Sequence, residues 1–313
     1  MAVVTYKRKE LCSFIGKDIA MRELEEKISM LGAPVEGINE SEDELSMDVT
    51  PNRLDLLGVE GMGRAVSAFL GIKKGLQEFK VEESGYSIEV DKSVKRVRPF
   101  IVGAVVKGVK VNNELIQSLM QIQEKIHETY GRKRKRVAIG IHNFDSLSPP
   151  FVYTTAKPKE VKFKPLDMNA ELTLGEILEM HPKGVDYAHI LKGSKRYPLV
   201  LDSKGNVASL PPIINGELTR VTESARNLFI EITGTSERAI EDTLNVLCTA
   251  FTDRGAKLYS LKVGKKVYPN LEPRKMKMSL KKMNKLLGSK FSSSEVHELL
   301  GKMGYGVKEG AKG

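Results

Sequence analysis

The middle of the chain constrains the fold more than any other part, because short apolar segments rich in β-branched residues recur there between turns. These strand candidates are FIVGAVVKGVKV, VAIGIHNF, FVYTTA, YPLVL, NVASL and NLFIEIT. The sequence DSKGN at residues 202–206 predicts a hairpin turn between two of them. Helical segments do not alternate regularly with the strands. The pattern therefore predicts an α+β fold with a central mixed β-sheet, not a doubly wound sheet.

Helices are expected before, within and after this region, where apolar residues recur at helical spacing. The predicted ranges, besides a helix near the N-terminus that ends at Gly32, are 54–71, 113–131, 174–180 and 237–255. Thr173 and Glu176 have the spacing of a capping box at the start of the third range. The glycines of GVEGMG fall inside the first range, which favours close packing over phosphate binding.

The two ends of the chain resemble each other. FIGKDIAMRELEEKISMLGAPV and LLGSKFSSSEVHELLGKMGYGV align without a gap, so that Gly16 matches Gly288 and Gly32 matches Gly304. Any two amphipathic helices that end in glycine look alike, which explains much of the similarity. The matched glycines and the trailing valine still favour a shared small helical module. Because the second copy stops at Gly313, we expect the chain to be cut within that module.

These features predict three domains. Residues 1–85 are expected to form an N-terminal helical and β module, residues 90–275 a β-rich central domain, and residues 276–313 the start of a truncated helical module. The flanking modules are expected to be winged-helix-like.

Composition excludes several classes of protein. Of 313 residues, 41% are hydrophobic and 29% are charged, as in a soluble globular protein. No apolar run approaches the ~20 residues that span a bilayer. Cys12 and Cys248 are far apart, which is typical of reduced thiols in a cytoplasmic protein. The net charge of +10 favours an anionic partner such as nucleic acid, although excess lysine often means only a well-solvated surface.

Motifs of metal, nucleotide and hydrolase chemistry are missing from the sequence. The five histidines form no ligand pair, and there is no HExxH, Walker loop, GxGxxG after a strand or GxSxG. A serine–histidine hydrolase remains compatible with the composition, but no spacing supports it.

The basic run GRKRKR leads directly into a strand candidate. If the run continues that strand, Arg132, Arg134 and Arg136 share one face and Lys133 and Lys135 the other. A solvated strand end is the default interpretation. The alternative turns one arginine inward to a ligand and leaves the others for phosphates.

Two further places suggest a pocket. SLPPIINGELTR combines two prolines with the turn-forming Asn215-Gly216, so its backbone is stiff and sharply turned beside a strand. Gln123 interrupts a half-buried helical row, where it either bonds backbone or lines a pocket.

TPNRLDLLGVEGMGRA, GRKRKRVAIGIHNFD, YPLVLDSKGNVASLPPIINGE and RNLFIEITGT together resemble the β subunits of archaeal and eukaryotic phenylalanyl-tRNA synthetases, in order and over essentially the whole chain. The resemblance implies that the central domain is an editing domain, which removes tyrosine by hydrolysis from mischarged tRNA-Phe. Aminoacylation is expected on the α subunit, because the ATP-binding motifs of that subunit are not found in this chain.

The resemblance also implies a set of site residues. Glu231, Thr233 and Ser209 are expected to act in hydrolysis, and the expected substrate-binding residues are Val200, Gln123, Arg134 and Asn215. Some archaeal relatives carry Asp in place of Glu231 and Leu in place of Val200, so the pocket depth and the reach of the carboxylate are expected to differ. Without the resemblance, Glu231 reads as an edge carboxylate paired with a nearby Lys or Arg.

Partners and cofactors follow from the same resemblance. The expected partners are tRNA-Phe, L-tyrosine as editing ligand, and the α subunit in a heterotetramer of two α and two β chains. No metal or cofactor is expected in this part, whereas ATP and Mg are expected for the complete cytoplasmic synthetase. Two alternatives are a non-catalytic tRNA-binding and assembly scaffold, and a free-standing deacylase, which the incomplete last module disfavours.

Overall fold

The structure is a computed structural model that describes residues 2–310. The chain divides into two compact units, one formed by Lys80–Asn270 and the other by Met1–Phe79 with Leu271–Gly313. Both units combine helices with antiparallel or mixed strands, so the predicted α+β class is confirmed.

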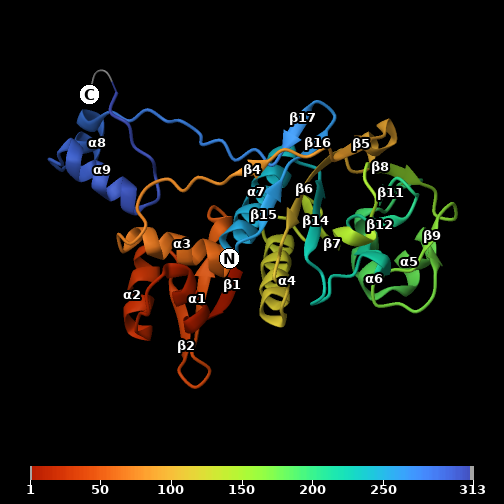
Figure 1. Cartoon of the computed structure of the whole chain (residues 1–313), viewed down its shortest axis with the longest axis horizontal. Helices are drawn as coiled ribbons and strands as arrows, with labels where there is room; N and C mark the ends of the chain where they lie inside the picture. The colour runs from red at the N-terminus through yellow and green to blue at the C-terminus, as the bar shows by residue number, and fades with distance from the viewer. Residues whose placement is uncertain (1, 311–313) are drawn as a thin grey trace. The chain divides into compact units, whose positions relative to one another are not determined.

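The strands of the unit Lys80–Asn270 form two large sheets where the sequence predicts one (Figure 1). The five-stranded sheet has the order β4 (Val81–Glu82), β15 (Lys257–Tyr259), β6 (Phe100–Lys107), β14 (Asn227–Gly234) and β7 (Val137–Asn143). The seven-stranded sheet has the order β13 (Ile214–Asn215), β12 (Val207–Leu210), β11 (Tyr197–Leu201), β8 (Phe151–Ala156), β5 (Ser87–Val90), β16 (Leu261–Val263) and β17 (Lys266–Tyr268). A small pair joins β9 (Lys162–Phe163) to β10 (Leu172–Thr173).

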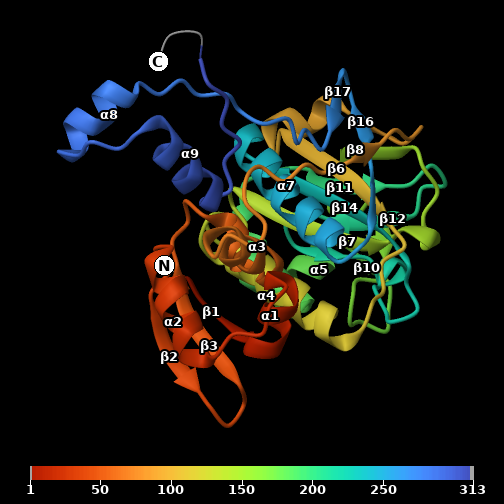
Figure 2. The same ribbon diagram turned by 60° about the vertical axis from the view of Figure 1, so that its left-hand side comes forward.

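Strand β14 is buried on both faces, which explains why Leu228, Phe229 and Ile230 are consecutive apolar residues and do not alternate with polar ones. On one face, Phe229 packs in a core with Phe151 and Tyr153 of β8, in the seven-stranded sheet. On the other face, a Cβ at Gly234 would meet Ile240 of helix α7 (Glu237–Asp253) at 2.6 Å. Helix α7 contacts β6, β14 and β15 and lies across the five-stranded sheet in Figure 2.

The remaining helices of this unit are short apart from α4 (Asn113–Glu128), which contacts β7. The short helices are α5 (Leu174–Met180), α6 (Pro182–Tyr187) and the 3-10 turns η2 (Lys92–Arg96), η3 (Phe144–Ser146), η4 (Ala188–Ile190) and η5 (Glu217–Thr219). The predicted capping box of Thr173 and Glu176 is confirmed at α5. The predicted hairpin turn is also confirmed, since Asp202 accepts hydrogen bonds from the backbone of Lys204 and Asn206.

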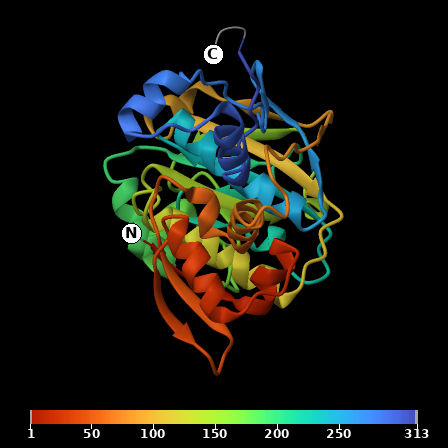
Figure 3. The ribbon, with the colours of Figure 1, turned by 90° about the vertical axis from the view of Figure 1, so that its left-hand side faces the viewer.

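The other unit contains a three-stranded antiparallel sheet, order β1 (Ala2–Lys7), β3 (Glu44–Val49), β2 (Val35–Asn39), whose β2–β3 hairpin is seen in Figure 3. Its helices are α1 (Arg8–Ile15), α2 (Met21–Met30), α3 (Val59–Phe69), α8 (Leu280–Leu287) and α9 (Ser293–Lys302). The predicted helix 54–71 is wrong in one respect. It is broken at Gly58 into the 3-10 turn η1 (Leu54–Leu57) and α3, because Gly58 has an extended backbone.

Glycines in this unit serve the packing that the sequence indicates. A Cβ at Gly61 would meet the carbonyl oxygen of Asp55 at 2.0 Å, and one at Gly63 would meet Cβ of Phe14 at 2.3 Å. The chain can therefore approach α3 closely only because these positions carry no side chain.

The repeat between the chain ends is matched element by element. Helices α1 and α8 each have 8 residues, and α2 and α9 each have 10. Each first helix ends at a left-handed glycine, with φ of 86° at Gly16 and 63° at Gly288. Each second helix is followed by another left-handed glycine, with φ of 87° at Gly32 and 80° at Gly304. The aligned glycines thus occupy equivalent helix ends.

Candidate functional site

A cavity of about 380 Å³ lies within the unit Lys80–Asn270, a volume typical of small-molecule sites. Its lining comes from α4, β7, β14, the turn after α4, the segment 209–221, and residues of 166–167 and 181–183. Five of the seven residues expected at a site line it: Gln123, Arg134, Ser209, Asn215 and Glu231. The structure therefore brings together residues that are up to 108 positions apart in the sequence, as the interval from Gln123 to Glu231 shows.

Val200 and Thr233 are buried beside lining residues. Val200 is fully buried on β11 and pairs with Ser209 of β12 in the sheet register. Thr233 is fully buried on β14 and pairs with Ala138 of β7. These two residues support the walls, whereas the polar groups of the other five reach the cavity.

Glu231 lies in the middle of β14, opposite Gly140 of β7. Only 2% of its surface is exposed. The Ser209 hydroxyl donates a hydrogen bond of 2.8 Å to Oε1 of Glu231, whereas Oε2 is buried and has no partner within residues 2–310. Glu231 is thus not an edge carboxylate paired with a basic residue. A buried acceptor without a donor is unfavourable unless a ligand or water supplies one.

His142 lies beside this carboxyl group. Its Nε2 is 3.7 Å from Oε1 of Glu231, and its Nδ1 is 2.8 Å from Oγ1 of Thr219. The imidazole ring stacks on Phe229, with 5.7 Å between ring centroids. The sheet register allows this approach because Gly140 lies between the two groups and has no side chain.

The segment 209–219, which we call the strap, connects the two sheets through its polar contacts. Besides the bond from Ser209 to Glu231, the Asn215 amide donates to the carbonyl of Ile141 on β7 at 3.3 Å. Thr219 contacts His142 as described above. The stiff, turned backbone that the sequence indicates thus forms one wall of the cavity, and its contacts reach two strands of the opposite sheet.

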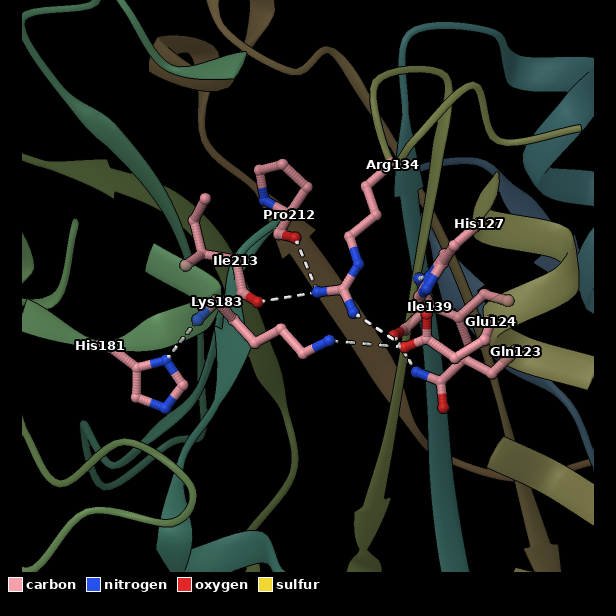
Figure 4. Close-up of polar contacts among 9 residues, drawn as sticks. All are labelled: Gln123, Glu124, His127, Arg134, Ile139, His181, Lys183, Pro212 and Ile213. Carbon is pink, nitrogen blue, oxygen red and sulfur yellow. Dashed lines mark hydrogen bonds and ion pairs between the residues drawn. The ribbon is translucent and has the colours of Figure 1, made fainter. Parts of the chain in front are cut away.

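Arg134 closes the cavity between the strap and helix α4, as Figure 4 shows. Its Nη1 donates to the carbonyl of Ile213 at 2.9 Å, and its Nη2 lies 3.3 Å from Oε1 of Glu124 on α4. The guanidinium also stacks over the ring of Tyr187, 4.3 Å from its centroid. Its Nε is buried without a hydrogen-bond partner in the part of the chain that the structure describes. One donor of a buried cation is therefore left for a ligand.

The interpretation of the basic run as a strand is wrong. Residues 129–135 form consecutive turns, and β7 begins only at Val137. Arg132, Lys133 and Arg134 have φ values of 50°, 51° and 65°, so their backbone is left-handed. This conformation turns Arg134 inward, where it is 8% exposed, and leaves Arg132 and Lys133 exposed. The run divides between one buried side chain and a solvated group.

His127 of α4 supplies a second unpartnered donor. Its Nε2 accepts a hydrogen bond of 2.9 Å from the backbone N–H of Ile139, so the proton of the neutral ring is on Nδ1. This Nδ1 is buried and has no hydrogen-bond partner among the described residues. Burial holds the pKa of His127 well below its usual range, and the nearby cations Arg134 and Arg98 lower it further. The ring is therefore a neutral donor at pH 7.

Gln123 satisfies both interpretations that the sequence leaves open. Its Nε2 donates to the carbonyl of Ile139 at 2.8 Å, and the residue also lines the cavity. Gln123 and His127 together bond the carbonyl and the N–H of one residue of β7, which fixes α4 against the strand (Figure 4).

Thr233 is bound to a buried arginine. The guanidinium of Arg98 donates to Oγ1 of Thr233 at 2.8 Å and to its carbonyl at 2.7 Å. Burial lowers the pKa of Arg98 to about 10, and attraction to Glu231 partly offsets this. Arg98 thus places a buried positive charge that interacts electrostatically with Glu231.

Sequence reasoning missed His127, His142, Arg98 and Thr219. In the sequence, the histidines lack the spacing of metal-ligand pairs, and this gives no signal for another role. Residues 2–310 contain no cluster that could hold a metal ion. The relevant signal for His142 is its position two residues after Gly140 on the same strand face, but only the pairing with β14 gives that position a meaning.

Comparison with known proteins identifies the class of the central unit first. Residues 86–255 match the B3/4 domain family. The β subunit of phenylalanine–tRNA ligase from Methanospirillum hungatei is 43% identical over 309 residues, covering 99% of this chain and 56% of that protein. The corresponding subunit of Methanocaldococcus jannaschii is 40% identical over 303 residues, covering 95% of this chain and 55% of that protein.

The fold is also similar to a solved structure, an N-terminal fragment of the phenylalanyl-tRNA synthetase β subunit from Pyrococcus horikoshii. The TM-score is 0.94 at 37% identity, with 99% of this chain and 91% of that chain covered. The chain belongs to the phenylalanyl-tRNA synthetase β-subunit family. It spans about half the length of the curated relatives it matches. Within residues 2–310, no helix has the length and apolar character needed to cross a bilayer.

Proposed function

We propose that the cavity is an editing site that hydrolyses tyrosine wrongly attached to tRNA-Phe, within a complete synthetase that also contains an α subunit. The observation that carries the proposal is the buried Glu231 carboxyl group, which lines the cavity with Oε2 unpartnered and Oε1 bound to Ser209. A phenol hydroxyl is a donor that such an oxygen lacks.

Chemistry supports the need for a second site. Tyrosine differs from phenylalanine by one hydroxyl group, and an apolar pocket rejects an added hydroxyl by only ~10²-fold. A site that hydrogen-bonds the hydroxyl discriminates more strongly, because its own buried groups lose their partner when phenylalanine binds. Glu231 and Ser209 meet this requirement.

The wall of the cavity formed by α4 and the turn after it suits the reacting ester and the end of the tRNA. His127 and Arg134 carry the unpartnered N–H groups, which can donate to carbonyl or phosphate oxygens. An aminoacyl ester is already activated, so a positioned water and donors for the developing oxyanion suffice for hydrolysis. The site needs no serine or cysteine nucleophile. For the complete enzyme, ATP and Mg belong to aminoacylation on the α subunit.

The test replaces Glu231 in the complete synthetase. Glu231→Ala is expected to lower the rate of Tyr-tRNA-Phe deacylation at least tenfold, because a hydrogen bond to a charged group is worth about 1.5–3 kcal/mol. Deacylation is measured with purified Tyr-tRNA-Phe, and phenylalanylation of tRNA-Phe in the same preparation reports that the enzyme is assembled. Glu237→Gln, which changes an exposed carboxylate paired with Lys266, is the matched control.

Near-normal deacylation by the Glu231→Ala enzyme would show that Glu231 does not recognise the tyrosine hydroxyl. If the wild-type enzyme does not deacylate Tyr-tRNA-Phe but still binds tRNA, the cavity belongs to a non-catalytic tRNA-binding and assembly scaffold.

A further inference from the structure

His142 has no part in the proposed function, yet it is fully buried and its Nε2 lies 3.7 Å from Oε1 of Glu231. Its exposure is 0% and that of Glu231 is 2%. Both Nε2 of His142 and Oε2 of Glu231 are buried polar atoms without a hydrogen-bond partner in residues 2–310. Two such atoms side by side in one cluster require an explanation, since buried polar groups are nearly always paired.

The position of the proton on His142 is constrained by Thr219. The Thr219 hydroxyl lies 2.8 Å from Nδ1 of His142 and 3.0 Å from the carbonyl oxygen of Gly216. It has one proton to donate. If that proton goes to Gly216, Nδ1 must be protonated and donate to Thr219. If it goes to Nδ1, Nδ1 is the acceptor and a neutral ring carries its proton on Nε2.

Nε2 faces Oε1 of Glu231 at 3.7 Å in either case. A bare Nε2 would direct its lone pair at an oxygen of the buried carboxyl group, which is electrostatically unfavourable. A proton on Nε2 makes the same contact attractive. It is present in the second arrangement above, and also in the first if the ring is an imidazolium.

Gly140 makes the contact sterically feasible. A Cβ at this position would lie 2.4 Å from Oε1 of Glu231 and 2.7 Å from Nε2 of His142. Because Gly140 pairs with Glu231 in the β7–β14 register, its hydrogen atoms are all that separates the two groups. The backbone thus reserves the space in which the two side chains meet.

We propose that His142 is a positioning residue that directs an Nε2–H at Glu231. Together with Ser209 it holds Oε1, so that Oε2 remains as the acceptor for the tyrosine hydroxyl. The proposal rests on the proposed function for the identity of the ligand, but not for the contact between His142 and Glu231 itself. The other titratable groups that interact electrostatically with Glu231 are Arg98 and Tyr153.

The first experiment reads the proton directly in the ligand-free chain. The sequence contains five histidines, so selective ¹⁵N labelling of imidazoles gives a spectrum that can be assigned by comparison with His142→Gln. We expect a protonated Nε2 of His142 at pH 7 whose signal shifts in Glu231→Gln. A bare Nε2 in the wild-type chain, or no response to Glu231→Gln, would overturn the proposal.

The second experiment uses two substitutions that divide the ring's two functions. The amide of His142→Gln can replace Nε2, and that of His142→Asn can replace Nδ1. We expect L-tyrosine affinity, measured by calorimetry, to fall about tenfold or more in His142→Asn, the loss of one hydrogen bond to a charged group, and less than about threefold in His142→Gln. Equal losses in the two variants would contradict the assigned role.

Urea unfolding identifies a variant that fails to fold. If one of the two variants does not fold, the imidazole spectrum of the wild-type chain alone tests whether Nε2 of His142 is protonated. If the wild-type chain does not bind L-tyrosine, the proposed function is contradicted at this site. The protonation of Nε2 then still decides the role of His142 beside Glu231.

Discussion

Two walls of the cavity, which we call the acceptor end (β14 and the strap) and the donor end (α4 and the turn after it), differ in the polarity of their unpartnered atoms. At one end, on β14 and the strap, the unpartnered atom is an acceptor, Oε2 of Glu231. At the other end, on α4 and the turn after it, the unpartnered atoms are donors, Nδ1 of His127 and Nε of Arg134. A ligand that satisfies all three must carry a donor at one end and acceptors at the other. Tyrosine esterified to a nucleotide has this polarity, with its phenol hydroxyl at one end and ester and phosphate oxygens at the other.

The ends also differ in how they are built. The acceptor end depends on strand register, since Glu231, Gly140 and His142 are brought together by the pairing of β14 with β7. The donor end depends on a strained turn and a helix, which Arg134 connects to the strap. Variants that damage one end should therefore leave the other measurable, and this permits the comparison to be tested.

The largest effect is expected for Gly140→Ala, which acts on the acceptor end alone. Its Cβ would displace the carboxylate of Glu231 and the ring of His142, so we expect deacylation of Tyr-tRNA-Phe to fall more than tenfold and stability to fall by about 1–3 kcal/mol. Deacylation by the complete synthetase and urea unfolding of the chain measure the two effects. Gly85→Ala, where a Cβ meets nothing within 4 Å, is the control. Unchanged deacylation in Gly140→Ala would mean that the Glu231 site does not recognise tyrosine.

Arg134→Ala should affect the donor end selectively. We expect the KM for Tyr-tRNA-Phe deacylation to rise about tenfold or more, because a charged donor is lost, while the Kd for free L-tyrosine changes little. Stability should also decrease, since carbonyls of the strap and Glu124 lose their partner. Arg132→Ala is a matched control, because Arg132 lies in the same turn but is exposed. A parallel loss of free tyrosine binding would show that the two ends are not independent.

The smallest effect concerns the pH dependence of stability at the donor end. Because burial lowers the pKa of His127, the folded chain binds fewer protons than the unfolded chain below the ordinary histidine pKa of ~6.5. Stability should therefore be lost as pH falls below ~6.5, with a contribution of at most about 1.4 kcal/mol per pH unit from this one group. We expect His127→Gln to flatten the slope of unfolding free energy against pH between 7 and 5. An identical slope in both proteins would mean that His127 is protonated in the folded state.

The sequence predicts the elements whose signals are local. Apolar and β-branched runs define β8 and β11 at the bounds that the structure shows, and the capping box marks the start of α5. Resemblance to a family supplies Glu231, Ser209 and Arg134, which the structure places on one cavity. None of these signals reveals that the strands form two sheets, because the division depends on which strands pair across the chain.

Non-local pairing also explains what was missed in the site. His142 becomes a neighbour of Glu231 only through the register of β7 with β14, and Thr219 reaches it only because the strap folds back. The sequence wrongly predicts a strand for the basic run, because composition does not distinguish an extended strand with basic residues from consecutive left-handed turns. No glycine, asparagine or aspartate marks positions 132–134, although these are the residues that usually adopt such a backbone.

That left-handed turn implies a trade-off between stability and activity. Each of Arg132, Lys133 and Arg134 occupies a conformation that costs a residue with a side chain about 1–2 kcal/mol. Glycine would relieve this cost at the exposed positions 132 and 133, but at 134 it would remove the guanidinium that joins the strap to α4. Glycine at position 132 or 133 is therefore a stabilising substitution that selection for thermal resistance could reach. The same change at position 134 would open the cavity wall.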